Sequence, residues 1–135
     1  MIRITLACAG KLKENYLREA EQEFTKRLGA YCQLETRCIP EEKMPENPSP
    51  AVKEQVLEKE TERILKLIPE HSFVVLLDLR GKEISSPQLA EKMEQWMVEG
   101  VSHLTFVIGG PFGYTDALRK RADFRWSFSP LTFTH

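Results

Sequence analysis

Two short runs of apolar residues restrict the fold of this chain more than any other feature. Residues 73–79 read FVVLLDL, interrupted only by Asp78, and residues 104–108 read LTFVI. A strand that is covered on both faces has this continuous apolar pattern, which is typical of parallel sheets. Each run is far shorter than the roughly 18–20 apolar residues that cross a bilayer. The two runs therefore predict central strands of a buried parallel sheet.

The segments around these runs alternate between helix and strand patterns. Apolar side chains recur at helical spacing in residues 14–28, 50–68 and 86–97, and Ser49-Pro50 and Ser86-Pro87 are typical helix starts. A short helix is expected at 115–122, and further strands are expected at 3–9, 33–39 and 124–128. This alternation predicts an α/β fold with a mostly parallel sheet, formed by a single domain over residues 1–135.

Charge and cysteine usage exclude several classes of protein. The chain has 19 Lys and Arg against 20 Asp and Glu. The resulting net charge of −1 excludes a strongly basic nucleic-acid binder but leaves an RNA contact through shape open. Cys8, Cys32 and Cys38 form no C-x-x-C pair and the histidines form no H-x-x-x-H pair, so we expect no disulfide framework and no metal. Without a signal peptide or membrane span, we expect a cytoplasmic protein with no membrane partner.

The carboxyl ends of the expected strands predict where a ligand binds. Ligands of open parallel sheets bind beyond these ends, which here are residues 77–81, 108–113 and 128–133. The GGxxG pattern at 109–113 matches neither G-x-G-x-x-G nor a P-loop, which argues against a nucleotide-binding protein of unrelated function. From the residues alone, this glycine turn is either structural or part of a site. Asp78 either caps the next turn or serves the site.

One dense basic cluster lies near the end of the sequence. It consists of Arg119, Lys120, Arg121 and Arg125. Two interpretations remain open at this point: the cluster is the solvated face of a short helix, or it contacts phosphate groups.

Four sequence blocks, in this order and spacing, resemble the RlmH (YbeA) family of SPOUT-class methyltransferases. They are the opening residues 4–13, LDLRGK at 77–82, FVIGGPFG at 106–113 and SFSPLTFTH at 127–135, so the resemblance covers the whole chain. The family methylates N3 of a pseudouridine in the 23S rRNA of the large subunit, acting on assembled ribosomes. Its methyl donor is S-adenosyl-L-methionine. The resemblance therefore implies an RNA methyltransferase with a SPOUT-like α/β fold.

The resemblance also implies a set of site residues. Carried over residue by residue, the cofactor site comprises Leu77, Gly109, Phe128, Ser129, Pro130, Leu131, Thr132 and Phe133. These residues lie in the same three loops that the strand ends indicate. His135 follows the last of these loops and is the candidate catalytic base. Arg119, Lys120, Arg121 and Arg125 become candidate RNA contacts, and the implied partners are 23S rRNA in the ribosome and a second copy of the chain.

The family pattern continues beyond the last residue of this sequence. In the family, the Thr-Phe-x-His motif leads into a C-terminal helix that forms a trefoil knot behind the cofactor loop and supports the homodimer. The sequence ends at His135. We therefore expect an incomplete knot, with weak cofactor binding and activity in a chain of this length. The alternative function is a non-catalytic α/β module that dimerises or binds ribosomes without a complete cofactor site.

Overall fold

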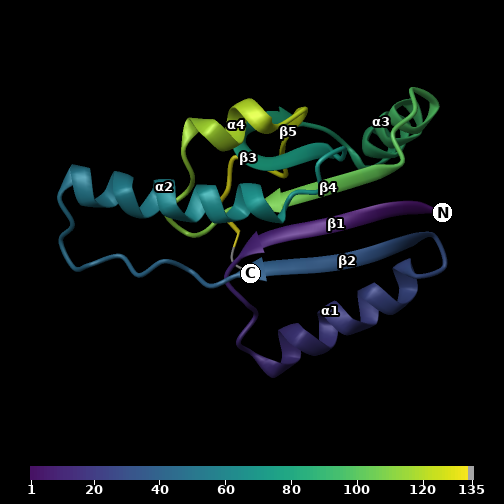
Figure 1. Cartoon of the computed structure of the whole chain (residues 1–135). Coiled ribbons are helices and arrows are strands. Elements are labelled where there is room, and N and C mark those ends of the chain that lie inside the picture. Colours follow the sequence, from purple (N-terminus) through teal and green to yellow (C-terminus); the bar gives the residue numbers. More distant parts are fainter. Residues whose placement is uncertain (134–135) are drawn as a thin grey trace.

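Five strands form one sheet in the computed structural model, which describes residues 1–133 (Figure 1). The strands are β1 (Ile2–Ala9), β2 (Cys32–Ile39), β3 (Phe73–Glu83), β4 (His103–Ile108) and β5 (Phe124–Ser127). Their order across the sheet is β2-β1-β4-β3-β5, and each of these pairings is parallel. The predicted α/β fold with a mostly parallel sheet is confirmed.

The helices between the strands are α1 (Asn15–Leu28), α2 (Pro50–Leu67), α3 (Ser86–Val98) and α4 (Asp116–Arg121). The Val52 backbone N–H donates to Ser49 Oγ over 3.2 Å, which confirms the predicted start of α2. At α3 the capping hydroxyl belongs to Ser85 and not to Ser86. Its Oγ accepts from the Gln88 backbone N–H, while Gln88 Oε1 accepts from the Ser85 backbone N–H. No helix of the described residues is long and apolar enough to cross a membrane.

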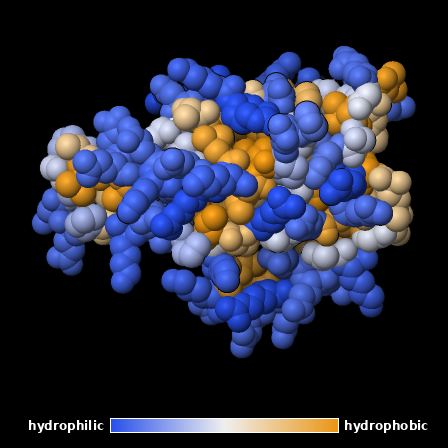
Figure 2. Space-filling model, in the orientation of Figure 1, coloured by the Kyte–Doolittle hydropathy of each residue, from blue (hydrophilic) through white to orange (hydrophobic). Residues whose placement is uncertain are grey.

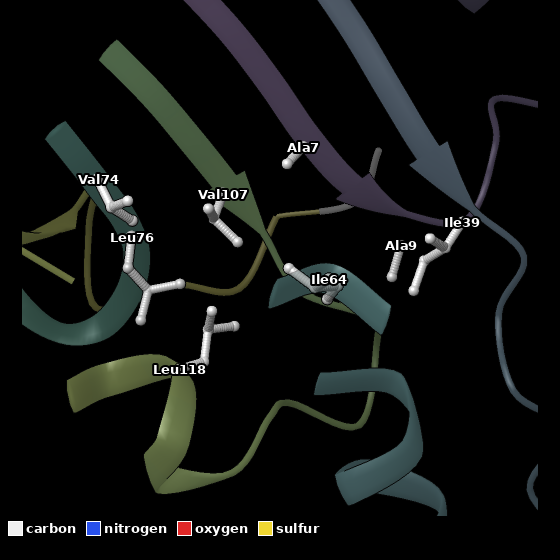
Figure 3. Packing of buried hydrophobic residues seen from close by; sticks show 8 residues of the cluster. All are labelled: Ala7, Ala9, Ile39, Ile64, Val74, Leu76, Val107 and Leu118. Carbon is white, nitrogen blue, oxygen red and sulfur yellow. The ribbon is translucent and has the colours of Figure 1, made fainter. Parts of the chain in front are cut away.

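The main core lies between the sheet and the helices α2 and α4. Its fully buried side chains come from three strands and two helices, and Ala7, Val74, Leu76 and Val107 face Ile64 and Leu118 (Figure 3). Each Val, Leu or Ile buried in this way contributes about 1.5–3 kcal/mol of transfer free energy. This packing fixes the carboxyl ends of β3 and β4, where the predicted ligand loops begin.

The opposite face of the sheet is less completely covered. Trp96 of α3 packs on the first residues of two strands, with ring centroids 4.4 Å from Phe73 and 5.6 Å from Phe124. Phe106 and Trp126 lie further along the strands and remain partly exposed. This face therefore leaves apolar surface accessible toward the carboxyl edge of the sheet.

The first helix differs from the expectation raised by its apolar stripe. None of the residues of α1 is buried, and Phe24 and Leu28 keep 59% and 42% of their surface exposed. The reason is the strand order: α1 lies beside β2, which is an edge strand, so the sheet does not continue beneath the helix (Figure 1).

Candidate functional site

The strand order places the three predicted ligand loops next to one another. In the β4-β3-β5 part of the sheet, Val107 pairs with Leu76 and Trp126 pairs with Leu77. Gly109 therefore lies two residues beyond the first pair, and Phe128 lies two residues beyond the second. The structure thus brings Leu77, Gly109 and the loop 128–133 to the same edge of the sheet. That this edge binds a cofactor stays a prediction.

Tyr114 connects two of these loops. Its hydroxyl donates a hydrogen bond to the Leu77 carbonyl oxygen over 3.1 Å. Its ring packs on Gly109 so closely that a Cβ at this position would lie 2.6 Å from the ring. Burial and the nearby Asp78 carboxylate raise the pKa of the Tyr114 phenol, so the hydroxyl remains protonated. Tyr114 is not among the residues expected from the sequence, although its place directly after the glycine turn is a signal.

Helix α2 holds the glycine turn through two buried polar residues, Glu60 and Thr61. A Cβ on Gly110 would overlap the Glu60 carboxylate, which accepts a hydrogen bond from the Glu42 backbone N–H over 3.2 Å. Thr61 Oγ1 accepts from the Thr115 backbone N–H over 3.0 Å. Desolvation raises the pKa of Glu60, opposed by backbone donors that include Gly110. Neither residue stands out in the sequence, because both lie within a highly charged helix.

The loop that follows β5 presents apolar side chains to solvent. Phe128 contacts Trp126 edge-on at a centroid distance of 4.6 Å and lies 6.3 Å from Phe133. Two hydrogen bonds keep the loop compact: Ser127 Oγ donates to the Ser129 carbonyl (3.0 Å), and the Leu131 backbone N–H donates to Ser129 Oγ (2.9 Å). Phe128, Leu131 and Phe133 are each at least 60% exposed, and Pro130 and Thr132 are also exposed.

The structure divides the basic cluster into two parts. Arg125 Nη1 lies 3.4 Å and Arg119 Nε lies 3.6 Å from Oδ2 of the buried Asp78. Arg121 instead donates to the Ser72 carbonyl over 3.1 Å, just before the start of β3. Lys120 is exposed. The cluster is therefore not one surface, because only Arg119 and Arg125 converge.

Asp78 has the capping role that the sequence suggested and a further one. Its Oδ1 accepts from the Arg80 backbone N–H over 3.0 Å, which caps the turn. Its Oδ2 faces the two arginines. His135, the candidate base, lies outside the described residues. Within residues 1–133, no group of three or more His, Cys, Asp and Glu side chains is placed to hold a metal ion.

The three cysteines are free thiols, and two of them pack against each other between neighbouring strands. Cys8 of β1 pairs in register with Cys38 of β2, and their sulfur atoms lie 2.9 Å apart. Burial and the Cys38 thiol raise the pKa of Cys8 to about 12, which keeps this thiol protonated and unreactive at neutral pH.

Comparison with known proteins identifies the family to which this chain belongs. Residues 2–135 match the family described as "Predicted SPOUT methyltransferase", and the chain belongs to this family.

Among its curated relatives is the ribosomal RNA large subunit methyltransferase H of Desulfitobacterium hafniense, 47% identical over 135 residues, which is 100% of this chain and 84% of the relative. The protein of that name from Acetivibrio thermocellus is 44% identical over 134 residues, 99% of this chain and 84% of the relative. A putative ribosomal RNA large subunit methyltransferase H of Methanoregula boonei is 47% identical with the same coverage.

Proposed function

We propose that this chain methylates N3 of a pseudouridine in the 23S rRNA of the large ribosomal subunit, using S-adenosyl-L-methionine. The observation that carries the proposal is the 47% identity over the whole chain to a ribosomal RNA large subunit methyltransferase H. The geometry supports it, since three loops meet at the carboxyl edge of a parallel sheet, where such folds bind their ligands.

The residues at this edge suit S-adenosyl-L-methionine. Gly109 and Gly110 have no Cβ, so the Tyr114 ring and the Glu60 carboxylate can pack directly on the turn and hold its backbone in place. The exposed apolar side chains of loop 128–133 can cover the faces of an adenine, while loop backbone groups pair with its edge. Leu77, Gly109 and residues 128–133 would hold the cofactor, which supplies a methyl group made electrophilic by the sulfonium.

The residues of the chain have to supply alignment and a proton acceptor. Positioning the N3 nitrogen against the methyl carbon replaces a bimolecular encounter and provides much of the rate. The N3 proton must also leave, and we assign its removal to His135, which lies two residues after loop 128–133 in the sequence. Asp78 is poorly suited to that role because Arg80, Arg119 and Arg125 occupy its two oxygens.

Two further properties belong to this proposal. The rRNA is recognised in the cytoplasm through the shape of the assembled ribosome, since the net charge of −1 gives little general attraction for RNA.

The active form is a homodimer, supported by the exposed apolar residues Leu79, Phe112 and Phe128 at the carboxyl edge. Sedimentation velocity at rising concentration is expected to show a species of two chains, and a monomer throughout would contradict the dimer.

Methyl transfer to ribosomes that lack the modification tests the activity. Two proteins are compared: the 135-residue chain, and a chimera that continues past His135 with the remaining residues of the Desulfitobacterium hafniense relative. We expect labelled methyl groups at N3 of one pseudouridine of 23S rRNA, with the chimera more active. Transfer to another RNA or to another atom would contradict the proposal. Ribosome binding without transfer by either protein would favour the non-catalytic module.

A further inference from the structure

Cationic residues make up half of the lining of a cavity beside the candidate cofactor edge. It has a volume of about 280 Å³ and lies between the turn at 80–82, the start of β5 and helix α4. The cationic residues of its lining are Arg80, Lys82, Arg119 and Arg125. Asp123 also lines it, but the Val74 backbone N–H (2.8 Å) and Arg121 Nη1 (3.4 Å) already engage its carboxylate.

The positive charge of this lining is only partly balanced. The single carboxylate of Asp78 faces both Arg119 and Arg125. Arg80 and Lys82 form no ion pair with any residue between 1 and 133. Arg119 Nη1 is also paired with Asp116 over 2.8 Å, and Asp123 is paired with Arg121. Arg80 and Lys82 therefore carry the unbalanced positive charge of the described lining, and a bound anion would offset it.

Arg119 has a buried donor without an acceptor. Among the described residues its Nε forms no hydrogen bond, because the Asp78 oxygen is 3.6 Å away. The guanidinium is nevertheless held in a defined orientation, with its central carbon 4.9 Å from the centre of the Tyr114 ring. Its Nη1 is held by Asp116 over 2.8 Å, so this planar guanidinium is fixed and only partly paired, which suits an oxyanion.

The backbone around this cavity is shaped to present these cations. The pairing of β3 with β5 moves from Leu77–Trp126 to Lys82–Trp126, so residues 78–81 leave the ladder as a turn. Gly81 packs directly on β5, since a Cβ there would lie 2.6 Å from the Arg125 carbonyl carbon. Arg80 and Lys82 are thereby held on either side of a point where the turn touches β5.

The geometry points to this cavity as the binding site for a phosphodiester group of the RNA substrate, close to the nucleotide that is methylated. This inference rests on the proposed function. Tyr114 connects the two sites, because it contacts Arg119 on one side and both Leu77 and Gly109 on the other. A phosphate in the cavity would place the RNA backbone next to the cofactor loops. The carboxylate of the cofactor is the other oxyanion that could bind, and the experiments separate the two sources.

The first experiment uses inorganic phosphate as the probe and requires no activity. Phosphate is titrated into ¹⁵N-labelled protein while the Nε–H signals of Arg119 and Arg125 are followed by NMR. We expect saturable shifts of both signals, and weaker binding in the Arg80→Gln/Lys82→Gln variant, whose side chains form no ion pair that folding needs. The matched control Arg27→Gln/Lys53→Gln also loses two surface cations and should bind like the wild type. Absent shifts, or equal binding by both variants, would overturn the inference.

The second experiment identifies the source of the oxyanion. Ribosome binding is measured by co-sedimentation at several salt concentrations, and S-adenosyl-L-methionine binding is measured by NMR titration. For Arg80→Gln/Lys82→Gln we expect about tenfold weaker ribosome binding and a salt slope smaller by about 1–2, with unchanged cofactor affinity. Weaker cofactor binding with unchanged ribosome binding would overturn the inference and assign the cavity to the cofactor carboxylate. Failure of the wild type to bind ribosomes would contradict the proposed function. The phosphate titration would still show whether the cavity binds an oxyanion.

Discussion

Apolar side chains are buried in the core beneath α2 and α4 but exposed at the carboxyl edge of the same sheet. Val74, Leu76 and Val107 are 0% exposed in the core, whereas Phe128, Leu131 and Phe133 at the edge are 60%, 69% and 61% exposed. The strands are thus held by packing in the core, and apolar side chains remain uncovered at the carboxyl edge. Apolar surface left exposed at a strand end contributes little to stability, so its presence indicates binding.

Figure 2 shows how one side of the molecule is covered. Most of this side is hydrophilic, and the largest group of apolar residues lies in its middle. Charged helices such as α1 and α2 supply much of the hydrophilic cover, which agrees with a chain in which 29% of residues are charged. The comparison therefore separates residues whose loss should unfold the protein from residues whose loss should affect ligand binding.

Truncation of the core should have the largest effect on stability. Leu76→Ala removes a fully buried side chain between β3 and the helices α2 and α4. We expect it to lower the free energy of unfolding by about 2–5 kcal/mol, because the cavity it leaves cannot be refilled. Urea unfolding followed by circular dichroism measures this loss. A loss below that of Phe128→Ala would contradict the assignment of the two regions.

A methyl group at the glycine turn should affect both stability and ligand binding. In Gly109→Ala the new Cβ would lie 2.6 Å from the Tyr114 ring, so the ring must shift and its bond to the Leu77 carbonyl weakens. We expect a stability loss of about 1–3 kcal/mol by overpacking. Tyr114→Phe keeps the ring and removes only the hydroxyl, and it is the control for the hydrogen bond. Unchanged cofactor affinity in Gly109→Ala would show that this turn is not part of the cofactor site.

Truncation at the edge should spare the fold and weaken binding. Phe128→Ala loses an exposed ring and one edge-on contact with Trp126, so we expect less than about 1.5 kcal/mol of lost stability. Cofactor affinity should fall, because this ring belongs to loop 128–133 of the proposed cofactor site. Titration with S-adenosyl-L-methionine measures the change, and Phe24→Ala, exposed on α1, is the matched control. Equal affinities of the two variants would contradict the site.

Glu60 should change how the stability of the protein depends on pH. Its pKa in the folded state is raised above the usual 4.5, so folding favours the protonated form, and stability falls as the pH rises from about 4.5 through the raised value. Glu60→Gln lacks this loss and should therefore gain stability relative to the wild type between acid and neutral pH. Urea unfolding at several pH values tests the sign. A constant difference between the two proteins would show that Glu60 does not titrate in the fold.

His103 should give the smallest effect. Burial lowers its pKa below the usual 6.5, assisted by Arg3 and Arg37, and its Nε2 lies 2.7 Å from Thr5 Oγ1. Because the folded state favours the neutral ring, its contribution is complete above pH 6.5 and is lost as the pH falls through the folded pKa. His103→Gln should flatten this part of the stability curve. A steeper decline in the variant would contradict the direction of the shift.

The sequence predicted the parts of the fold that depend on local pattern. The runs at 73–79 and 104–108 form neighbouring strands, and Ser49 caps its helix as expected. The exposure of Phe24 could not be foreseen, because the helical stripe does not reveal that its helix lies beside an edge strand. The strand ends indicated the three loops. The contacts of Glu60 depend on tertiary packing and leave no signal in the sequence, whereas Tyr114 is marked only by its place directly after the glycine turn.

The most direct test of the account is NMR mapping of S-adenosyl-L-methionine at millimolar concentration, which also detects weak binding. We predict that the largest backbone amide shifts occur at Leu77, Gly109 and residues 128–133, excluding Pro130, while amides of α1 and β2 stay unchanged. Absence of shifts at these loops, or shifts centred on another part of the molecule, would contradict the assignment of the carboxyl edge as the cofactor site.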